Sequence, residues 1–270
     1  MSFEQTCSYL GNAKLGILGA GHLGRAIAGG LLAAGFANDK LAICRPRSTE
    51  TYQRLAEADL TECVTDTDAF LRQTKIILYA VRPQDYQTLG KFTLRADYLL
   101  VSFLAGIPLA RLPDCQRVRV MPSAPDTLQQ QNGIAALYPA DNVVVRELLT
   151  VLKLRLFPLQ HESQMHAFTA LGTCLPIALT YWESLGRGVE DTELSELAAK
   201  FALPNYAAVL AWADSVKPHG LSAEERTNYV RQAATPGGVT EAILQGINAG
   251  QRLSCALGCG IARSIELSAG

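Results

Sequence analysis

Residues 19–24 read Gly-Ala-Gly-His-Leu-Gly, and this stretch decides the fold class of the chain. It follows a short apolar run at Leu15–Gly19, which predicts a buried strand. It opens an amphipathic stretch at Leu23–Ala34, which predicts a helix that ends at Gly35. Between a strand and a helix, a GxGxxG pattern is typical of a dinucleotide-binding turn. Its three glycines allow the tight turn, the approach of backbone to pyrophosphate, and close packing of helix on strand.

The rest of the first half repeats this alternation of short apolar runs and helical stretches. Further strands are predicted at Leu41–Cys44, Ile76–Val81, Leu99–Phe103 and Arg117–Met121, with a turn at Pro83. Strands separated in this way indicate a parallel sheet with right-handed crossovers. We therefore expect an α/β Rossmann domain with a doubly wound, mainly parallel sheet.

The second half changes character between Phe157 and Ser163. Its apolar periodicity predicts helices at Met165–Leu185, Leu194–Ala213, Ala223–Ala233 and Thr240–Glu266, the last interrupted near Gly250. Small residues on several helix faces permit close packing of helices. The predicted organisation is a dinucleotide-binding Rossmann domain at 1–160, followed by an all-helical dimerisation and substrate domain at 161–270.

Composition narrows the class of protein. Apolar residues make up 49% and charged residues 18% of the 270 residues, which is enough for a sizeable core. The net charge of −1 argues against a nucleic-acid partner, which demands a strong basic excess. No apolar run reaches the roughly 18–20 residues of a membrane span, and residues 1–13 lack the order of a signal peptide. We therefore expect a cytoplasmic protein with no membrane partner.

Seven cysteines are scattered along the chain without a CxxC pair. Their odd number suits free thiols in a reducing compartment better than a disulfide framework. Cys255 and Cys259 lie four residues apart, on one face of a predicted helix, but no other ligand cluster accompanies them. We expect these to be packing thiols and expect no metal site.

The end of the second predicted strand indicates which dinucleotide binds. Enzymes that use NAD usually place an acid there, on the ribose 2′-hydroxyl. This chain has Arg45, Arg47 and Ser48 instead, and two guanidinium groups with a hydroxyl suit the 2′-phosphate of NADPH. The alternative is that both arginines are ordinary solvated surface charges.

An ordered set of motifs now points to a family. After the glycine loop come Ala-Val-Arg-Pro-Gln at 80–84, Val-Ser-Phe-Leu-Ala-Gly-Ile at 101–107, Arg-Val-Met-Pro at 119–122 and Thr-Pro-Gly-Gly-Val-Thr at 235–240. From about Lys14 to Leu267 the chain resembles the pyrroline-5-carboxylate reductases. The resemblance implies an NADPH-dependent reductase of a cyclic imine carboxylate, with pyrroline-5-carboxylate reduced to proline as the expected reaction of proline biosynthesis. It also implies a helical domain that forms an intertwined homodimer or a multiple of it.

The resemblance also implies the roles of individual residues. Ala80, Val81 and Pro83 are expected beside the nicotinamide ribose, Thr67 near the adenosine and Ala105 near the nicotinamide. The predicted cofactor site comprises Gly19, Gly21, His22, Leu23, Gly24, Arg45, Arg47, Ser48, Thr67, Ala80, Val81, Pro83 and Ala105.

The 235–240 turn matches the loop that holds the substrate carboxylate in that family. A Pro-Gly-Gly turn into a helix exposes amides at the positive end of a dipole, which agrees with this role. The predicted substrate residues are Thr235, Gly237, Gly238 and Thr240, and Thr240 is the predicted catalytic hydroxyl nearest the imine nitrogen. The alternative is an ordinary helix entry with Thr240 as a cap.

Departures from the family leave other functions open. Its Ser-Gly-Ser-Gly-Pro-Ala stretch is Gly-Thr-Cys-Leu-Pro-Ile at 172–177 here, and Leu175 and Ile177 add volume. This favours a reductase of another imine or ketimine acid as one alternative, and a non-catalytic NADPH-binding dimer as another. A two-domain hydroxyacid dehydrogenase is disfavoured because Met165–Leu185 contains no lysine to act as the proton donor.

Overall fold

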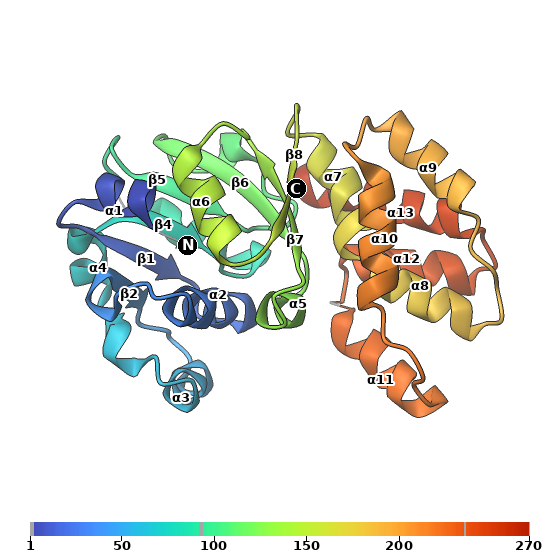
Figure 1. Ribbon diagram of the computed structural model, residues 1–270, viewed down its shortest axis with the longest axis horizontal. Helices are drawn as coiled ribbons and strands as arrows, with labels where there is room; N and C mark the ends of the chain where they lie inside the picture. The colour runs from blue at the N-terminus through green and yellow to red at the C-terminus, as the bar shows by residue number, and fades with distance from the viewer. Residues whose placement is uncertain (1–2, 92–93, 235, 270) are drawn as a thin grey trace. The chain divides into compact units, whose positions relative to one another are not determined.

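A computed structural model describes residues 3–91, 94–234 and 236–269. The chain divides into two compact units, residues 1–158 and 159–270, which are coloured blue to green and yellow to red in Figure 1. Dinucleotide binding by the first unit, and dimerisation and substrate binding by the second, stay predictions.

The first unit is built on one eight-stranded sheet with the order β3-β2-β1-β4-β5-β6-β7-β8 (Figure 1). The strands are β1 Lys14–Leu18, β2 Leu41–Cys44, β3 Val64–Thr65, β4 Thr74–Tyr79, β5 Leu99–Ser102, β6 Gln116–Pro122, β7 Ile134–Tyr138 and β8 Arg155–Pro158. All neighbours are parallel apart from β6 and β7, which are antiparallel. The predicted fold class, a doubly wound and mainly parallel sheet, is confirmed.

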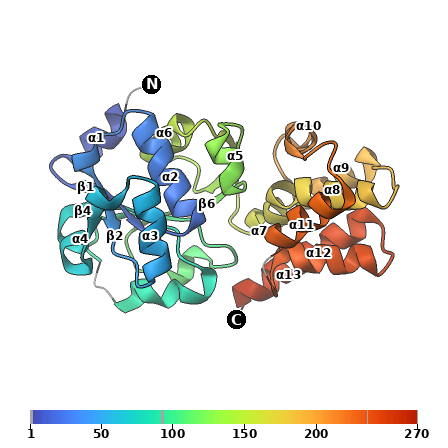
Figure 2. The same ribbon diagram turned by 90° about the horizontal axis from the view of Figure 1, so that it is seen from below.

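Helices cover both faces of this sheet, as Figure 2 shows from below. They are α1 Glu4–Leu10, α2 His22–Ala33, α3 Thr49–Glu57, α4 Thr67–Gln73, α5 Pro125–Gln129 and α6 Val143–Val151, with short 3₁₀ turns that include η3 Pro83–Lys91 and η4 Leu109–Arg111. Side chains of α1, α2 and α6 pack on one face. Phe70 of α4 packs on the other, together with Tyr98 and Leu112.

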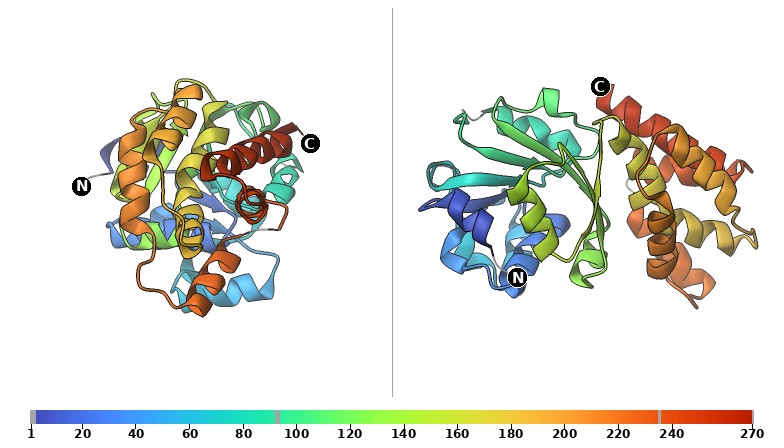
Figure 3. Two further views of the ribbon diagram at one scale, coloured as in Figure 1. Left: turned by 90° about the vertical axis from the view of Figure 1, so that its right-hand side faces the viewer. Right: turned by 45° about the horizontal axis from the view of Figure 1, so that its top comes forward.

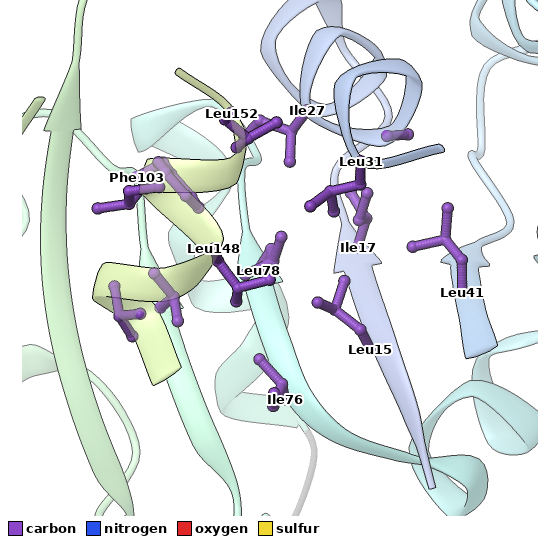
Figure 4. Close-up of a cluster of buried hydrophobic side chains, with 14 of the residues drawn as sticks. Leu15, Ile17, Ile27, Leu31, Leu41, Ile76, Leu78, Phe103, Leu148 and Leu152 are labelled. Carbon is purple, nitrogen blue, oxygen red and sulfur yellow. The ribbon is translucent and has the colours of Figure 1, made fainter. Parts of the chain in front are cut away.

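The core under α2 and α6 explains why the strand sequences are almost wholly apolar. Ile17 of β1 and Leu78 of β4 are buried beneath Leu31 of α2 and Leu148 of α6 (Figure 4). Central strands covered on both faces bury most of their side chains, so β1, β2, β4 and β5 contain apolar runs and not an alternating pattern.

The strand order places a crevice at one edge of the sheet. The order reverses between β1 and β4, because β1 continues to β2 and β3 on one side while β4 continues to β5 on the other. Ligands of open α/β sheets bind outside the carboxyl ends of the strands at such a point. The segments that follow β1, β2 and β4 meet there.

The second unit is helical throughout its described residues (Figure 3). Its helices are α7 Gln164–Phe168, a π-helical turn Thr169–Thr173, α8 Leu175–Ser184, α9 Asp191–Lys200, α10 Tyr206–Val216, α11 Ala223–Ala233, α12 Val239–Asn248 and α13 Leu253–Ala269. Glycines let α12 and α13 approach closely: a Cβ on Gly260 would lie 2.5 Å from Ile243, and one on Gly246 would lie 3.0 Å from Ala256.

Two of the helices predicted for this unit are each divided in the structure. The helix expected at Met165–Leu185 is interrupted by the π-helical turn, and the one expected at Leu194–Ala213 ends before Pro204, where Ala202 and Asn205 adopt positive φ. Proline removes a backbone donor and disfavours helical geometry in the residue before it, which explains the second break. The interruption predicted near Gly250 is confirmed, with Gly250 at φ +79 between α12 and α13.

No described helix is long and apolar enough to cross a membrane.

Candidate functional site

A cleft of about 350 Å³ opens at the carboxyl ends of the strands that flank the reversal of strand order. Its walls come from the loops after β1, β2 and β4 and from the start of α4. Predicted cofactor residues that line it are Gly19, Gly21, Arg45, Arg47, Ser48, Thr67, Ala80 and Val81. Segments up to 60 residues apart in sequence are thus brought to one place, which is where a dinucleotide binds in this fold.

The three glycines of the loop have the distinct environments that a phosphate-binding turn needs. Gly19 has φ +110, and a Cβ there would lie 2.5 Å from the Ala80 carbonyl carbon. A Cβ on Gly24 would lie 2.0 Å from the Gly19 oxygen, so the third glycine lets α2 pack against the turn. A Cβ on Gly21 would meet nothing within 4 Å, so this glycine leaves open space beside the first amides of α2.

Positive charge dominates the cleft. Arg45, Arg47 and Arg82 line it, against Asp85 as its one acidic lining residue in the described ranges. The Arg45 guanidinium lies 5.9 Å from the centre of the Tyr52 ring, and the Ser48 hydroxyl accepts a hydrogen bond from the Thr51 amide at 3.3 Å. Ser48 is therefore the N-cap of α3, so the amides that begin this helix lie beside the two arginines. These residues fit the diphosphate and 2′-phosphate of NADPH.

Several predicted cofactor residues lie outside the lining of this cleft. The exposed His22 side chain has its Nε2 3.4 Å from Asp126 Oδ1 of α5. Leu23 and Gly24 belong to the first turn of α2, where Gly24 serves packing. Pro83 begins η3, and Ala105 follows β5. Their roles at a bound cofactor stay predictions.

The cleft also contains residues that the sequence analysis did not single out as cofactor ligands. Arg82 and Asp85 follow β4 directly, and Thr51 lies in the first turn of α3. Arg82 had a usable signal, because it is a cation within the 80–84 motif beside two predicted ligands. Thr51 had no such sequence signal, because its position depends on where α3 begins.

Cys44 ends β2 with its Sγ 3.7 Å from Thr67 Oγ1, and burial raises the pKa of its thiol.

The predicted substrate turn belongs to the second unit. Thr235 lies outside the described residues. Gly237 has φ +71, which favours glycine, whereas Gly238 is extended at φ −90 and serves as the N-cap of α12. Gly237 is therefore the residue of this turn whose backbone conformation favours glycine.

The Gly237 amide has a partner within the chain. It donates to Glu241 Oε2 at 2.7 Å, and the Gly237 carbonyl accepts from Arg263 Nε at 2.8 Å. Arg263 also pairs with Glu266 at 2.9 Å. The first amides of an α-helix have no partner within the helix, so those at the start of α12 are the groups that the predicted carboxylate role would use. Glu241 is a feature that the sequence pattern did not reveal.

Thr240, the predicted catalytic residue, lies in the first turn of α12 and is 9% exposed. Its Oγ1 lies 3.4 Å from the Sγ of Cys174, at the start of α8. Leu175 and Ile177, which replace smaller residues of the resembled family, are both buried. Their added volume lies in the packed interior of this unit.

The chain is similar to known proteins in both its first unit and most of its length. Residues 14–106 match the family model described as "NADP oxidoreductase coenzyme F420-dependent". A pyrroline-5-carboxylate reductase of Methanosarcina acetivorans is 27% identical over 89% of this chain and 83% of its own length. One from Pseudomonas aeruginosa is 28% identical over 87% of this chain and 89% of its own. The chain is similar to pyrroline-5-carboxylate reductases over most of its length.

These similarities confirm the family resemblance drawn from the sequence, and with it the predicted class, an oxidoreductase that uses NADP. A solved pyrroline carboxylate reductase of Plasmodium falciparum with NADP bound superposes with a TM-score of 0.55. It covers 95% of this chain and 98% of its own at 17% identity, a likeness that shows the shared fold alone. Similarity at this level supports an NAD(P)H-dependent reductase and leaves the substrate to be proposed.

Proposed function

We propose that this protein is an NADPH-dependent reductase of a cyclic imine carboxylate, and that pyrroline-5-carboxylate, reduced to proline, is its substrate. The observation that carries the proposal is the cationic cleft at the reversal of strand order, in a chain similar to pyrroline-5-carboxylate reductases over most of its length. The test is turnover of pyrroline-5-carboxylate with NADPH by the purified protein, which is described at the end of the Discussion.

Reduction of an imine requires few chemical groups from the protein, because the cofactor provides the hydride. The bound nicotinamide supplies the hydride to the imine carbon. The residues of the chain align the substrate, hold its carboxylate and provide a proton to the nitrogen. We assign the carboxylate to the amides at the start of α12, and the hydroxyl nearest the nitrogen to Thr240. The remaining predicted cofactor residues keep the roles given by the resemblance.

A second candidate is a reductase of a different imine acid. The bulk of Leu175 and Ile177, in place of glycine and alanine of the resembled family, supports it. A panel of cyclic imines that differ in ring size separates the two candidates, because a reductase of a different imine acid should prefer a ring other than that of pyrroline-5-carboxylate. A non-catalytic NADPH-binding dimer would bind cofactor and reduce no member of the panel.

A homodimer, or a multiple of it, is proposed as the assembly. Leu185 and Ile265 of the helical unit are 44% and 47% exposed. A groove of about 520 Å³ in the same unit is lined in part by Leu179, Val189 and Leu210. The groove is also lined by Glu183, Asp191, Asp214 and Lys217, so the proposed interface combines apolar and charged side chains. Light scattering at micromolar concentration should give at least twice the mass of one chain, and a monomer would contradict the assignment.

Glu241 provides a test of the carboxylate assignment. Its carboxylate holds the Gly237 amide and adds negative charge beside the proposed anion site. Glu241→Gln keeps the shape and removes the charge, so the KM for an anionic imine acid should fall about three- to tenfold, as expected for one partly solvated charge. The KM for an uncharged cyclic imine should stay within about twofold, because it lacks the group that the charge repels.

The matched control for this substitution is Glu225→Gln. Glu225 occupies the same position in the first turn of α11 and accepts from the Ser222 amide at 2.9 Å. Both variants lose one helix-capping charge, so both should melt at slightly lower temperature. An equal fall in KM for both variants, or none for Glu241→Gln, would show that the turn does not hold the carboxylate.

A further inference from the structure

Cys174 lies at an unusual point of the second unit, where a π-helical turn meets α8. Its amide donates to the Thr169 carbonyl, five residues back, at 3.0 Å, and its own carbonyl accepts from the Ala178 amide at 3.1 Å. An α-helix advances about 100° per residue, and a π-helical turn accommodates one residue more than an α-helical turn. The turn therefore changes the direction in which Cys174 projects from the helix.

The thiol is directed at the residue proposed to protonate the substrate. Cys174 is 8% exposed, and its Sγ lies 3.4 Å from Thr240 Oγ1, across 66 residues of sequence, in a contact where either group can donate. The neighbouring Thr173 hydroxyl donates to the Thr169 carbonyl at 2.9 Å, which ties the turn together. The contact joins the start of α8 to the start of α12.

The protonation state of this thiol decides what it can do. Burial raises the pKa of the Cys174 thiol, so the group stays S–H at neutral pH. A buried thiol of this kind is a weak hydrogen-bond donor and a poor nucleophile. The Cys174 thiol can therefore donate a hydrogen bond, but it does not act as a nucleophile toward a substrate.

A threonine hydroxyl has one proton and two acceptor positions. When its oxygen accepts from a neighbouring donor, its own proton is left to point elsewhere. Without that donor the hydroxyl rotates freely and can give its proton to a neighbouring carbonyl instead, as Thr173 and Thr169 do within this segment.

We propose that Cys174 is a positioning residue for the reaction: its thiol donates to Thr240 Oγ1 and so turns the Thr240 proton toward the substrate nitrogen. The inference rests on the proposed function and adds to it a group that does not touch the substrate. It also gives a reason for a π-helical turn at this point in the chain.

The alternative is that the Cys174 thiol only fills space in the core of this unit. Three variants at one position separate the two. Cys174→Ser keeps a donor, Cys174→Val fills the space without a donor, and Cys174→Ala removes both. Cys63→Ala is the matched control, because Cys63 is a buried thiol of the first unit, 7% exposed, with its Sγ 3.9 Å from the Asn38 carbonyl.

The positioning role predicts that kcat with the best cyclic imine falls about four- to tenfold in Cys174→Val and Cys174→Ala, the loss expected for one hydrogen bond. Cys174→Ser should stay within about twofold of the parent, and Cys63→Ala should keep its kcat. The KM for NADPH should not change in any variant. Val is larger than Cys and branched, so the thermal stability of each variant is measured beside its kcat, and the readout is the loss that Cys174→Val and Cys174→Ala share.

A double-mutant cycle completes the test. On a Thr240→Val background there is no hydroxyl to orient, so Cys174→Val should lower kcat no further. Full parental kcat in Cys174→Val, or losses that multiply in the double variant, would overturn the positioning role while leaving the reductase assignment intact. A parent protein that reduces no imine would instead overturn the proposed function, and the positioning role with it.

Discussion

Replacing Arg45 and Arg47 together with alanine should abolish the preference for NADPH over NADH. Hydrogen bonds to a charged group contribute about 1.5–3 kcal/mol each, so loss of both should weaken NADPH binding by at least about a hundredfold. NADH lacks the 2′-phosphate, so its affinity should change little. Titration of both cofactors against both proteins measures the two effects.

The structure gives this expectation its physical basis. Both arginines line the cleft directly after β2, and Ser48 caps α3 so that the amides of that helix face the same region. A phosphate placed there meets two cations and the positive end of a helix dipole. The alternative, two solvated surface charges, predicts equal affinities for NADPH and NADH in the parent protein.

A charge control belongs beside this variant. Arg54 lies in the last turn of α3 and pairs with Glu50 at 2.6 Å, outside the lining of the cleft. Arg54→Ala removes a positive charge from α3, near the two arginines in sequence, but should leave the ratio of the two affinities within about twofold. A comparable loss of NADPH binding in Arg54→Ala would assign the effect to general charge and remove the 2′-phosphate site.

The second large effect is expected at Thr240. Thr240→Val deletes the hydroxyl and roughly keeps the shape, so turnover should fall about a hundredfold, the lower end of the range for general acid catalysis. NADPH binding should be unchanged, because the proposed contact is with the substrate nitrogen. Steady-state kinetics and cofactor titration on one preparation separate these quantities. Full turnover in Thr240→Val would mean that the proton comes from solvent or from another group.

Gly237→Ala tests the same turn through its backbone. Gly237 has φ +71, so a side chain strains the turn and redirects the amides that follow it. The KM for an imine acid should rise more than kcat falls. Gly220→Ala is the matched control, because Gly220 has φ +70, has no atom within 4 Å of an added Cβ, and precedes α11. Both variants should lose similar thermal stability, and only Gly237→Ala should change the KM.

Much of the architecture was predictable because local signals and tertiary structure agree. The apolar runs within β1, β2, β4 and β5 are what a sheet covered on both faces requires, whereas β6 carries Arg117 and Arg119 among its apolar residues. The helix predicted at Ala223–Ala233 has the bounds of α11, where Ser222 and Glu225 form a capping box. The glycine loop could be identified because a GxGxxG pattern between a strand and a helix is typical of a dinucleotide-binding turn.

Other elements depend on contacts that a local pattern does not contain. The two-residue strand β3 exists because it pairs with Ile43 and Cys44 of β2. The π-helical turn at Thr169–Thr173 lies within an apolar stretch whose periodicity suits an uninterrupted helix, so no sequence signal marked it. Pro204 was a signal for the break between α9 and α10, and the apolar periodicity on either side of it concealed its effect.

The candidate site likewise contains residues that the sequence predicted and residues that only the structure revealed. The residue types that a dinucleotide needs follow from chemistry, so the glycines and arginines could be chosen from the sequence. The partners of Gly237 and Thr240 could not, since Glu241 and Cys174 reach them through the geometry of helix starts. These two partners are the residues on which the tests of substrate charge and of proton orientation depend.

The most direct test of the central claim is turnover of pyrroline-5-carboxylate by the purified protein. NADPH oxidation is followed by its absorbance, and proline is quantified in the same reaction. The account predicts one proline formed for each NADPH oxidised, with a kcat/KM for NADPH well above that for NADH. Tight NADPH binding without oxidation, across pyrroline-5-carboxylate and a panel of other cyclic imines, would contradict it.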